Sequence, residues 1–323
     1  MSPQPRVSVV VTTYNQARYI GPTLESVFAQ TRQADEVILV DDGSTDETPE
    51  AIAPYRDRLV YIRQVNQGVA GSRNTGIRHA QGALLAFLDG DDLWEPEKLA
   101  VQVAAAAAHP DSGLIAVNGV QFAETGLTIP SLFPAMIAPL FHGGAETVSV
   151  DASGYFLRAG IICTTSQVMI PARALETVGL SDPDLAVVSD WDLYVRIAER
   201  YPVTFVDRRL TRWRYHDRSV SGPDILRGLR WGEDGVIMFA KHARETTGER
   251  RKLVRAALKA QLLRAVQEAY YLAEAGQREV GLRALRRLLR WSRFSVAPAA
   301  FLLAAYVPAW LRGLVGGLVR KGL

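Results

Sequence analysis

Residues 89–92 place three carboxylates within four positions, directly after an apolar run over residues 83–88 that is bounded by glycines. Such a run predicts a buried, parallel strand, so the acids are expected at its C-terminal end. Carboxylates this close repel one another unless they are solvated or share a cation. A hard divalent ion held by Asp89 and Asp91 would satisfy that demand. An Asp-Gly turn with solvated acids is the alternative.

The segments before these acids alternate between strand and helix patterns. Residues 7–12, 37–40 and 59–62 are rich in β-branched and apolar residues, which predicts short buried strands. Helical patterns follow the first two strands, and a glycine-punctuated loop over residues 66–76 leads into a further helix. This alternation predicts an α/β fold with an open, mostly parallel, doubly wound sheet that has helices on both faces.

Polar residues follow three of the predicted strands where each strand ends. They are Thr12 with Tyr14, Asp42, and Asp89 with Asp91. Ligands of doubly wound sheets bind outside the carboxyl ends of the strands, so these side chains are expected to converge on one crevice. Neither Gly-x-Gly-x-x-Gly after the first strand nor Gly-Lys-Ser/Thr occurs, which argues against a dinucleotide enzyme or a P-loop NTPase. A metal at the acids would then hold a diphosphate, with Arg73 as a second cation.

Four motifs, in this order, resemble those of family 2 glycosyltransferases with the GT-A fold. They are Val7-Ser8-Val9-Val10-Val11-Thr12-Thr13-Tyr14-Asn15, Asp41-Asp42-Gly43-Ser44, Asn66-Gln67-Gly68 with Ser72-Arg73-Asn74, and Phe87-Leu88-Asp89-Gly90-Asp91-Asp92. The motifs lie within residues 1–100, and a fainter resemblance continues to residue 220.

The resemblance implies a role for each site residue. Thr12, Tyr14 and Asp42 would contact the base and ribose of a nucleotide-sugar, Arg73 would lie near the nucleotide, and Asp89 and Asp91 would form the Asp-x-Asp motif that binds Mn²⁺ or Mg²⁺. Ordinary packing at a strand end is the alternative for Thr12 and Tyr14. The family also carries an acidic-Asp-Trp motif whose Asp is the catalytic base, and Asp190 of this sequence matches it.

This chain departs from that motif because Ser189 stands where the family usually has Glu. Ser189 and Asp192 have the spacing of a capping box, so Asp192 is expected to hold the start of a helix and Asp190 is left free. Asp192 remains the alternative base. About 200° of helical rotation separates the two carboxylates, so both cannot point into the cleft. A structural carboxylate at the helix N-terminus is the alternative for Asp190.

A histidine follows the last predicted strand of the catalytic part. Arg214, His216, Ser219 and Ser221 resemble the Arg-x-His-x-x-Ser-x-Ser loop of the family, which closes over the diphosphate. This resemblance makes His216 a candidate substrate-binding residue, whereas a lone histidine is otherwise more often structural. Residues 119–160 are expected to be irregular acceptor-side loops, and residues 203–207 and 210–215 two short strands.

The sequence predicts a catalytic domain over residues 1–222, with a nucleotide-sugar half, 1–118, and an acceptor half, 119–222, followed by a helical tail over 223–323. Residues 241–323 carry 17 Lys and Arg against 5 Asp and Glu, a net +12, and the rest of the chain is net −9. The uncharged run 294–311 contains two prolines and follows an arginine cluster, so an interfacial segment on an anionic membrane is expected. A buried helix hairpin is the alternative.

The cysteine content and the N-terminal residues indicate where in the cell the protein is expected. Cys163 is the single cysteine, which excludes an intramolecular disulfide, and the polar N-terminus leads straight into a strand, so no signal peptide is expected. We therefore expect a cytoplasmic protein, peripheral on the inner face of the plasma membrane.

The resemblance implies a metal-dependent, inverting hexosyltransferase that moves sugar from a nucleoside-diphosphate-sugar, with UDP-sugar favoured, to a saccharide or lipid-linked acceptor hydroxyl. Cell-surface polysaccharide or glycolipid synthesis is the expected role, with no nucleic-acid partner. A nucleotidyltransferase would also use paired acids and a metal but would not need Asp190, and a non-catalytic nucleotide-sugar-binding protein is the third alternative.

Overall fold

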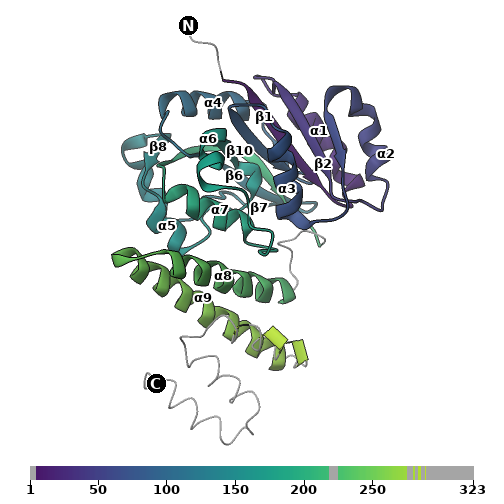
Figure 1. The fold of residues 1–323 in the computed structure, drawn as a ribbon. Helices are drawn as coiled ribbons and strands as arrows, with labels where there is room; N and C mark the ends of the chain where they lie inside the picture. The colour runs from purple at the N-terminus through teal and green to yellow at the C-terminus, as the bar shows by residue number, and fades with distance from the viewer. Residues whose placement is uncertain (1–4, 218–224, 275–278, 281–282, 285–287, 289–323) are drawn as a thin grey trace, which may run out of the picture. The chain divides into compact units, whose positions relative to one another are not determined.

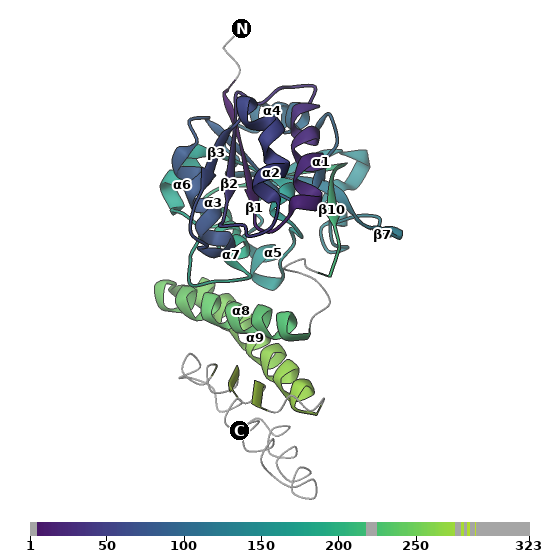
Figure 2. The same ribbon diagram turned by 90° about the vertical axis from the view of Figure 1, so that its right-hand side faces the viewer.

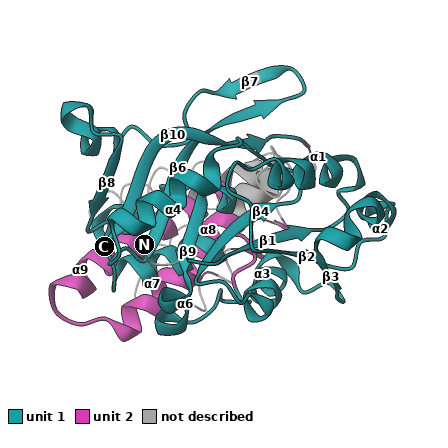
Figure 3. Ribbon diagram, turned by 90° about the horizontal axis from the view of Figure 1, so that it is seen from above, with its two compact units in different colours: residues 1–184, 189–216 teal, residues 185–188, 217–323 magenta. Residues whose placement is uncertain are grey.

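The computed structural model describes residues 5–217, 225–274, 279–280, 283–284 and 288 of the 323-residue chain. The chain forms two compact units (Figure 3). Unit 1 contains residues 1–184 and 189–216, and unit 2 contains residues 185–188 and 217–323.

One half of the sheet in unit 1 is parallel. It contains β1 (Val7–Thr13), β2 (Glu36–Asp41), β3 (Val60–Arg63) and β4 (Leu84–Asp89), in the order β3-β2-β1-β4. All three pairings between these strands are parallel, which confirms the prediction for this half. Their carboxyl ends therefore lie at the same edge of the sheet.

The other half of the sheet is mixed. β9 (Val168–Pro171) pairs antiparallel with both β4 and β6 (Leu114–Ala123), and β10 (Val203–Arg214) runs parallel to β6. The short strands β5 (Leu93–Trp94), β7 (Gly126–Ile129) and β8 (Thr147–Val150) add antiparallel pairs. Because β9 lies between β4 and β6, it brings the residues just before it next to the end of β4.

Two expectations for the second half are wrong in detail. Residues 119–160 are not irregular throughout, because they hold the end of β6, β7, β8 and α5 (Ser153–Arg158). The two strands expected around residues 203–215 form one strand, β10, with register shifts between Val206 and Arg209 and between Arg209 and Thr211. A bulge inserts extra residues while pairing with the neighbour continues, and in sequence it looks like a break.

Helices cover both faces of the sheet (Figure 1). Val9 and Val11 of β1 lie in a core cluster with residues of α1 (Ala17–Phe28) and α4 (Lys98–Ala108). Val10 points to the other face. There a Cβ on Gly76 of α3 (Gly68–His79) would lie only 2.2 Å from Val10 Cγ1. Alternating residues of one strand thus pack against different helices, as the predicted helices on both faces require.

The remaining helical segments of unit 1 are short. They are α2 (Thr48–Ile52), η1 (Ala53–Arg58), η2 (Ala138–Gly144), η3 (Thr165–Gln167), α6 (Ala172–Val178) and α7 (Ser189–Ala198). Of these, η3 and α7 carry residues of the site described below.

Unit 2 contains the two long helices α8 (Ile225–Glu245) and α9 (Gly248–Glu274), which pack along each other (Figure 2). A Cβ on Gly232 would lie 2.9 Å from the Ala265 side chain, so the helices approach closely there. Within the described ranges, no helix is both long and apolar enough to cross a bilayer. The run 294–311 and the loop serines Ser219 and Ser221 lie outside the described residues.

Candidate active site

The ends of β1, β2 and β4 bring the predicted polar residues to one edge of the sheet. In the parallel register Thr12 stands opposite Asp89, and Thr13 stands opposite Asp41. The Asp42 N–H donates to the Thr13 carbonyl at 2.9 Å, which places Asp42 beside the end of β1. Residues 12, 42 and 89 are thus grouped by strand pairing, as expected from their position after three strands.

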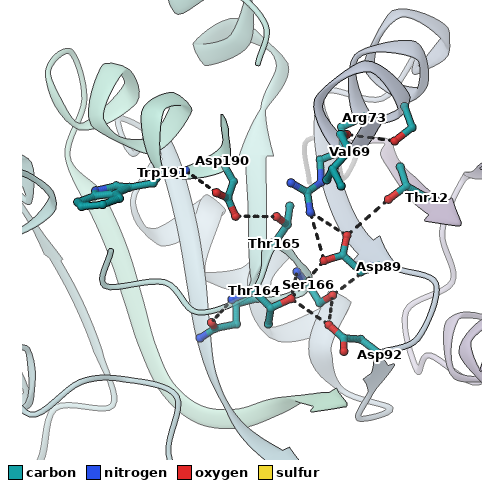
Figure 4. Close-up of polar contacts among 12 residues, drawn as sticks. Thr12, Val69, Arg73, Asp89, Asp92, Thr164, Thr165, Ser166, Asp190 and Trp191 are labelled. Carbon is teal, nitrogen blue, oxygen red and sulfur yellow. Dashed lines mark hydrogen bonds and ion pairs between the residues drawn. The ribbon is translucent and has the colours of Figure 1, made fainter. Parts of the chain in front are cut away.

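Asp89 is held by a buried arginine. Arg73 Nη2 lies 2.9 Å from Asp89 Oδ1 and 3.2 Å from Oδ2 (Figure 4). The Arg73 side chain is 9% exposed and the Asp89 side chain 28%. The Thr12 hydroxyl lies 3.5 Å from Asp89 Oδ1. Arg73 therefore contacts the acid at the end of β4 directly.

Asp190 enters the same cluster from the first turn of α7. Its Oδ1 accepts from the Trp191 N–H at 2.7 Å, and its Oδ2 lies 3.3 Å from the Thr165 hydroxyl (Figure 4). The Trp191 indole N–H donates to the Phe156 carbonyl at 2.8 Å, which anchors this turn on α5. Asp190 is thereby oriented by its own helix and by η3.

The charges of the cluster influence one another. Burial raises the pKa of Asp190 above its usual value, and the positive charge of Arg73 opposes that rise. Burial by itself would lower the pKa of Arg73, but the Asp89 and Asp190 carboxylates raise it, so the guanidinium stays charged. Burial, with Asp190 nearby, also raises the pKa of Tyr194, one turn further along α7. Arg73 thus interacts with two carboxylates, Asp89 and Asp190, that are 101 residues apart in sequence.

Three residues with hydroxyl side chains, Thr164, Thr165 and Ser166, lie just before β9 and contact the acids of the site, although the sequence did not predict them as site residues. Thr164 Oγ1 lies 2.9 Å from Asp92 Oδ2 and 3.4 Å from Asp89 Oδ2, and Ser166 Oγ accepts from the Asp89 N–H at 3.0 Å. Thr165 contacts Asp190 instead. A capping box between Thr164 and Gln167 shapes this turn. The Thr164 to Gln167 spacing of that box was the one signal available in the sequence.

His216 contacts the second acid of the Asp-x-Asp motif. His216 Nε2 lies 2.9 Å from Asp91 Oδ2, and the His216 and Tyr19 rings are 4.7 Å apart. Within the described residues no group of three or more His, Cys, Asp or Glu side chains could hold a metal ion. A carboxylate fits a Mn²⁺ or Mg²⁺ that keeps water and phosphate as its other ligands. An imidazole nitrogen beside it favours a transition metal such as Mn²⁺ over Mg²⁺. Each acid of the predicted pair thus has a partner in the structure, Arg73 for Asp89 and His216 for Asp91.

The nucleotide end of the predicted site lies at β2. Asp42 is 4% exposed, and its Oδ1 accepts from Gln64 Nε2 at 2.7 Å and from the Gln67 N–H at 2.9 Å. Tyr14 is 46% exposed just after β1. An exposed aromatic ring beside a fixed carboxylate can stack on a base while the carboxylate accepts hydrogen bonds.

Asp192, the alternative base, has a structural contact. Asp192 Oδ2 accepts from Arg196 Nε at 2.8 Å, and the Arg196 guanidinium also donates to the carbonyls of Val178 and Leu180. The carboxylate thus fixes an arginine that caps the C-terminal end of α6. This contact joins α7 to α6.

The family profile described as "Glycosyl transferase family 2" matches residues 8–159. The chain is 41% identical over 105 residues to the putative teichuronic acid biosynthesis glycosyltransferase TuaG of Bacillus subtilis, which covers 31% of this chain and 41% of TuaG. It spans about a third of the length of the first curated relatives it matches, which are uncharacterized glycosyltransferases.

Two solved structures share the fold. TarS of S. aureus in complex with UDP-GlcNAc has a TM-score of 0.65 at 19% identity, covering 98% of this chain and 88% of that one. The mannosyltransferase PcManGT of Pyrobaculum calidifontis, in complex with GDP-Man and Mn²⁺, has a TM-score of 0.56 at 22% identity, covering 96% and 88%. The fold is therefore of the GT-A type. Residues 8–159 are therefore similar to the family 2 glycosyltransferases.

The two acids of α7 are expected to respond oppositely to neutralisation. A carboxyl whose pKa is raised on folding opposes stability once pH exceeds its unfolded pKa. Asp190→Asn should therefore unfold at higher urea concentration than the wild type at pH 7, and the gain should vanish below about pH 4. Asp192→Asn weakens a charged hydrogen bond and should lower stability by about 1–3 kcal/mol. Urea titrations at both pH values measure this. Equal destabilisation by both changes would make Asp190 a helix-end carboxylate only.

Proposed function

We propose that this chain is an inverting glycosyltransferase that moves a sugar from a nucleoside-diphosphate-sugar to an acceptor hydroxyl. The observation that carries the proposal is the joint position of Asp190 and Asp89 around Arg73. It puts a carboxylate of raised pKa close to the strand ends where nucleotides bind in this kind of sheet. In-line displacement needs a base on the acceptor side and a group that neutralises charge at the leaving-group end, held in one site.

In the proposed reaction the acceptor hydroxyl gives its proton to an Asp190 oxygen as it attacks the anomeric carbon. The bond from that carbon to the diphosphate oxygen breaks, and the diphosphate leaves with both electrons. Because attack and departure are on opposite sides, the anomeric configuration inverts. Thr165 and the Trp191 N–H hold the Asp190 carboxylate, and the positive charge of Arg73 favours its ionised form.

Asp91 and His216 would hold a divalent cation, Mn²⁺ or Mg²⁺, which supplies positive charge for the departing diphosphate when bound. Asp89, turned toward Arg73, would support this end without being the main ligand. Arg214 lies over the rings of Tyr19 and Phe122, at 4.9 and 4.6 Å, and adds a cation near the diphosphate.

The donor and acceptor follow from the site and from the relatives. Asp42 and Tyr14 would bind ribose and base, with Thr12 at the same edge. UDP-sugar is the proposed donor because a structure of the same fold was solved with UDP-GlcNAc. A surface polysaccharide or its lipid-linked precursor is the proposed acceptor, since the relative TuaG is named for teichuronic acid biosynthesis.

The proposal is tested by separating binding from chemistry. Asp190→Asn should lose 10²- to 10⁴-fold in turnover, roughly the contribution of a positioned general base, and should still bind the donor. Asp192→Asn is the matched control on the same helix, and its turnover should persist. A panel of UDP-sugars and GDP-sugars with Mn²⁺ or Mg²⁺, read by nucleoside diphosphate release and by calorimetry, measures both quantities.

Release of pyrophosphate in place of nucleoside diphosphate would replace the proposal with a nucleotidyltransferase. Donor binding with no turnover by the wild type, over a panel of saccharide and lipid-linked acceptors, would favour a non-catalytic binding protein. Loss of turnover in Asp192→Asn with activity retained in Asp190→Asn would move the base to Asp192.

We further propose that the second unit binds anionic membrane surfaces, which would make the protein peripheral. Its helix α9 exposes a set of basic side chains together with two exposed leucines, Leu253 and Leu263. The basic residues are Arg251, Lys252, Arg255, Lys259 and Arg264. Residues 250–267 contain no Asp or Glu, and of this set Lys252 forms an ion pair, with Glu249 at 2.6 Å. Basic side chains near such a surface contribute about 1 kcal/mol each.

Reversing three of these charges together, with Arg251→Glu, Arg255→Glu and Lys259→Glu, should release the full chain from phosphatidylglycerol vesicles at low salt. Reversal of three exposed arginines of unit 1, Arg78, Arg158 and Arg200, is the matched control and should leave cosedimentation unchanged. High salt should weaken wild-type binding because the attraction is screened. Wild-type protein that stays in the supernatant at low salt would contradict the membrane proposal.

A further inference from the structure

Asp92, the third acid of the 89–92 motif, has no part in the chemistry proposed above. Its side chain is almost fully buried, with 1% of the residue exposed. Asp92 Oδ2 accepts from Ser166 Oγ at 2.6 Å and from Thr164 Oγ1 at 2.9 Å. Asp92 Oδ1 accepts from the Arg214 N–H at 2.8 Å. Both oxygens are thus occupied by partners from two distant segments.

The hydroxyl partners are themselves oriented toward Asp92. The Asp89 N–H donates to Ser166 Oγ at 3.0 Å, so the hydroxyl proton of Ser166 is directed to the carboxylate. The Ser166 N–H donates to Thr164 Oγ1 at 3.2 Å in the same way. Backbone N–H groups therefore orient the hydroxyls that bind Asp92, and this hydrogen-bond network favours one position of the Asp92 side chain.

Three contacts fasten the end of β10 to the acidic turn. They are Asp92 Oδ1 with the Arg214 N–H, the Asp91 carbonyl with Arg214 Nε at 2.8 Å, and Asp91 Oδ2 with His216 Nε2 at 2.9 Å. The last contact joins the two proposed cation ligands directly. A cation bound by Asp91 Oδ2 and His216 Nε2 would replace the direct contact between these two atoms. The two Arg214 contacts would then be the ones that keep His216 near Asp91.

We propose that Asp92 is a positioning residue that fixes the Arg214 backbone and thereby keeps His216 in place opposite Asp91. This inference rests on the proposed function, because it concerns the cation and diphosphate end of that site. It assigns the buried acid a task different from that of Asp89 and Asp91. Partners behind the ligands of a metal typically change its affinity by about 10- to 100-fold when they are removed.

The test compares Mn²⁺ binding, followed by the electron paramagnetic resonance signal of free Mn²⁺ in the presence of UDP, with steady-state kinetics. Asp92→Ala should weaken Mn²⁺ binding by about tenfold or more and raise the donor KM, with a smaller change in kcat at saturating donor and metal. Asp92→Asn retains an oxygen for the Arg214 N–H and should recover most of the affinity. Ser166→Ala removes one hydroxyl but leaves the Arg214 contact, so its affinity should lie closer to wild type than that of Asp92→Ala.

Equal Mn²⁺ affinity in Asp92→Ala and the wild type would overturn the inference. So would equal losses in Asp92→Ala and Ser166→Ala, since Asp92 would then serve only the hydroxyl network. If Asp92→Ala does not fold, Asp92→Asn and Ser166→Ala decide, because Asp92→Asn keeps the acceptor for the Arg214 N–H. Mn²⁺ affinity lost in Asp92→Asn but kept in Ser166→Ala would then overturn the inference. A wild type that neither binds Mn²⁺ nor transfers sugar would overturn the proposed function and this inference together.

Discussion

The site depends on one buried guanidinium. Two carboxylates from different halves of the chain, Asp89 at the end of β4 and Asp190 on α7, interact with it, and burial together with the charge of Asp89 raises the pKa of Asp190. The positive charge of Arg73 opposes the rise in the pKa of Asp190, and its guanidinium also donates directly to Asp89. The proposed base and the proposed leaving-group end can therefore share one small site.

The fold around this contact was predictable where sequence patterns are local. Residues 7–12 and 83–88 are near-continuous apolar runs, so their strands and their parallel pairing were expected from composition. The antiparallel insertion of β9 between β4 and β6 was not, because no local pattern states which strand a segment will pair with. Nor did the break near Arg209 look like a bulge, although β10 continues through it.

The site residues, too, were predictable only where the sequence around them has a local pattern. Motif residues that end strands, such as Thr12 and Asp89, were recognisable because their neighbours are strongly patterned. Thr164 and Ser166 lie in a turn with no such pattern, and they matter through contacts with acids more than 70 residues away. The contact between Arg73 and Asp89 could not be predicted either, because it depends on how α3 packs against β1 and β2. Reactive or ligand-binding residues are therefore easier to predict from sequence than the residues that position them.

The most direct test of this account is the pKa of the Asp190 carboxyl, measured by ¹³C NMR in the wild type, in Arg73→Gln and in Arg73→Lys. The account predicts a wild-type pKa above the ordinary Asp value of about 3.9, a further rise in Arg73→Gln, and a smaller change in Arg73→Lys, which keeps the positive charge. A wild-type pKa at or below the ordinary value, or the same pKa in the wild type and Arg73→Gln, would contradict it.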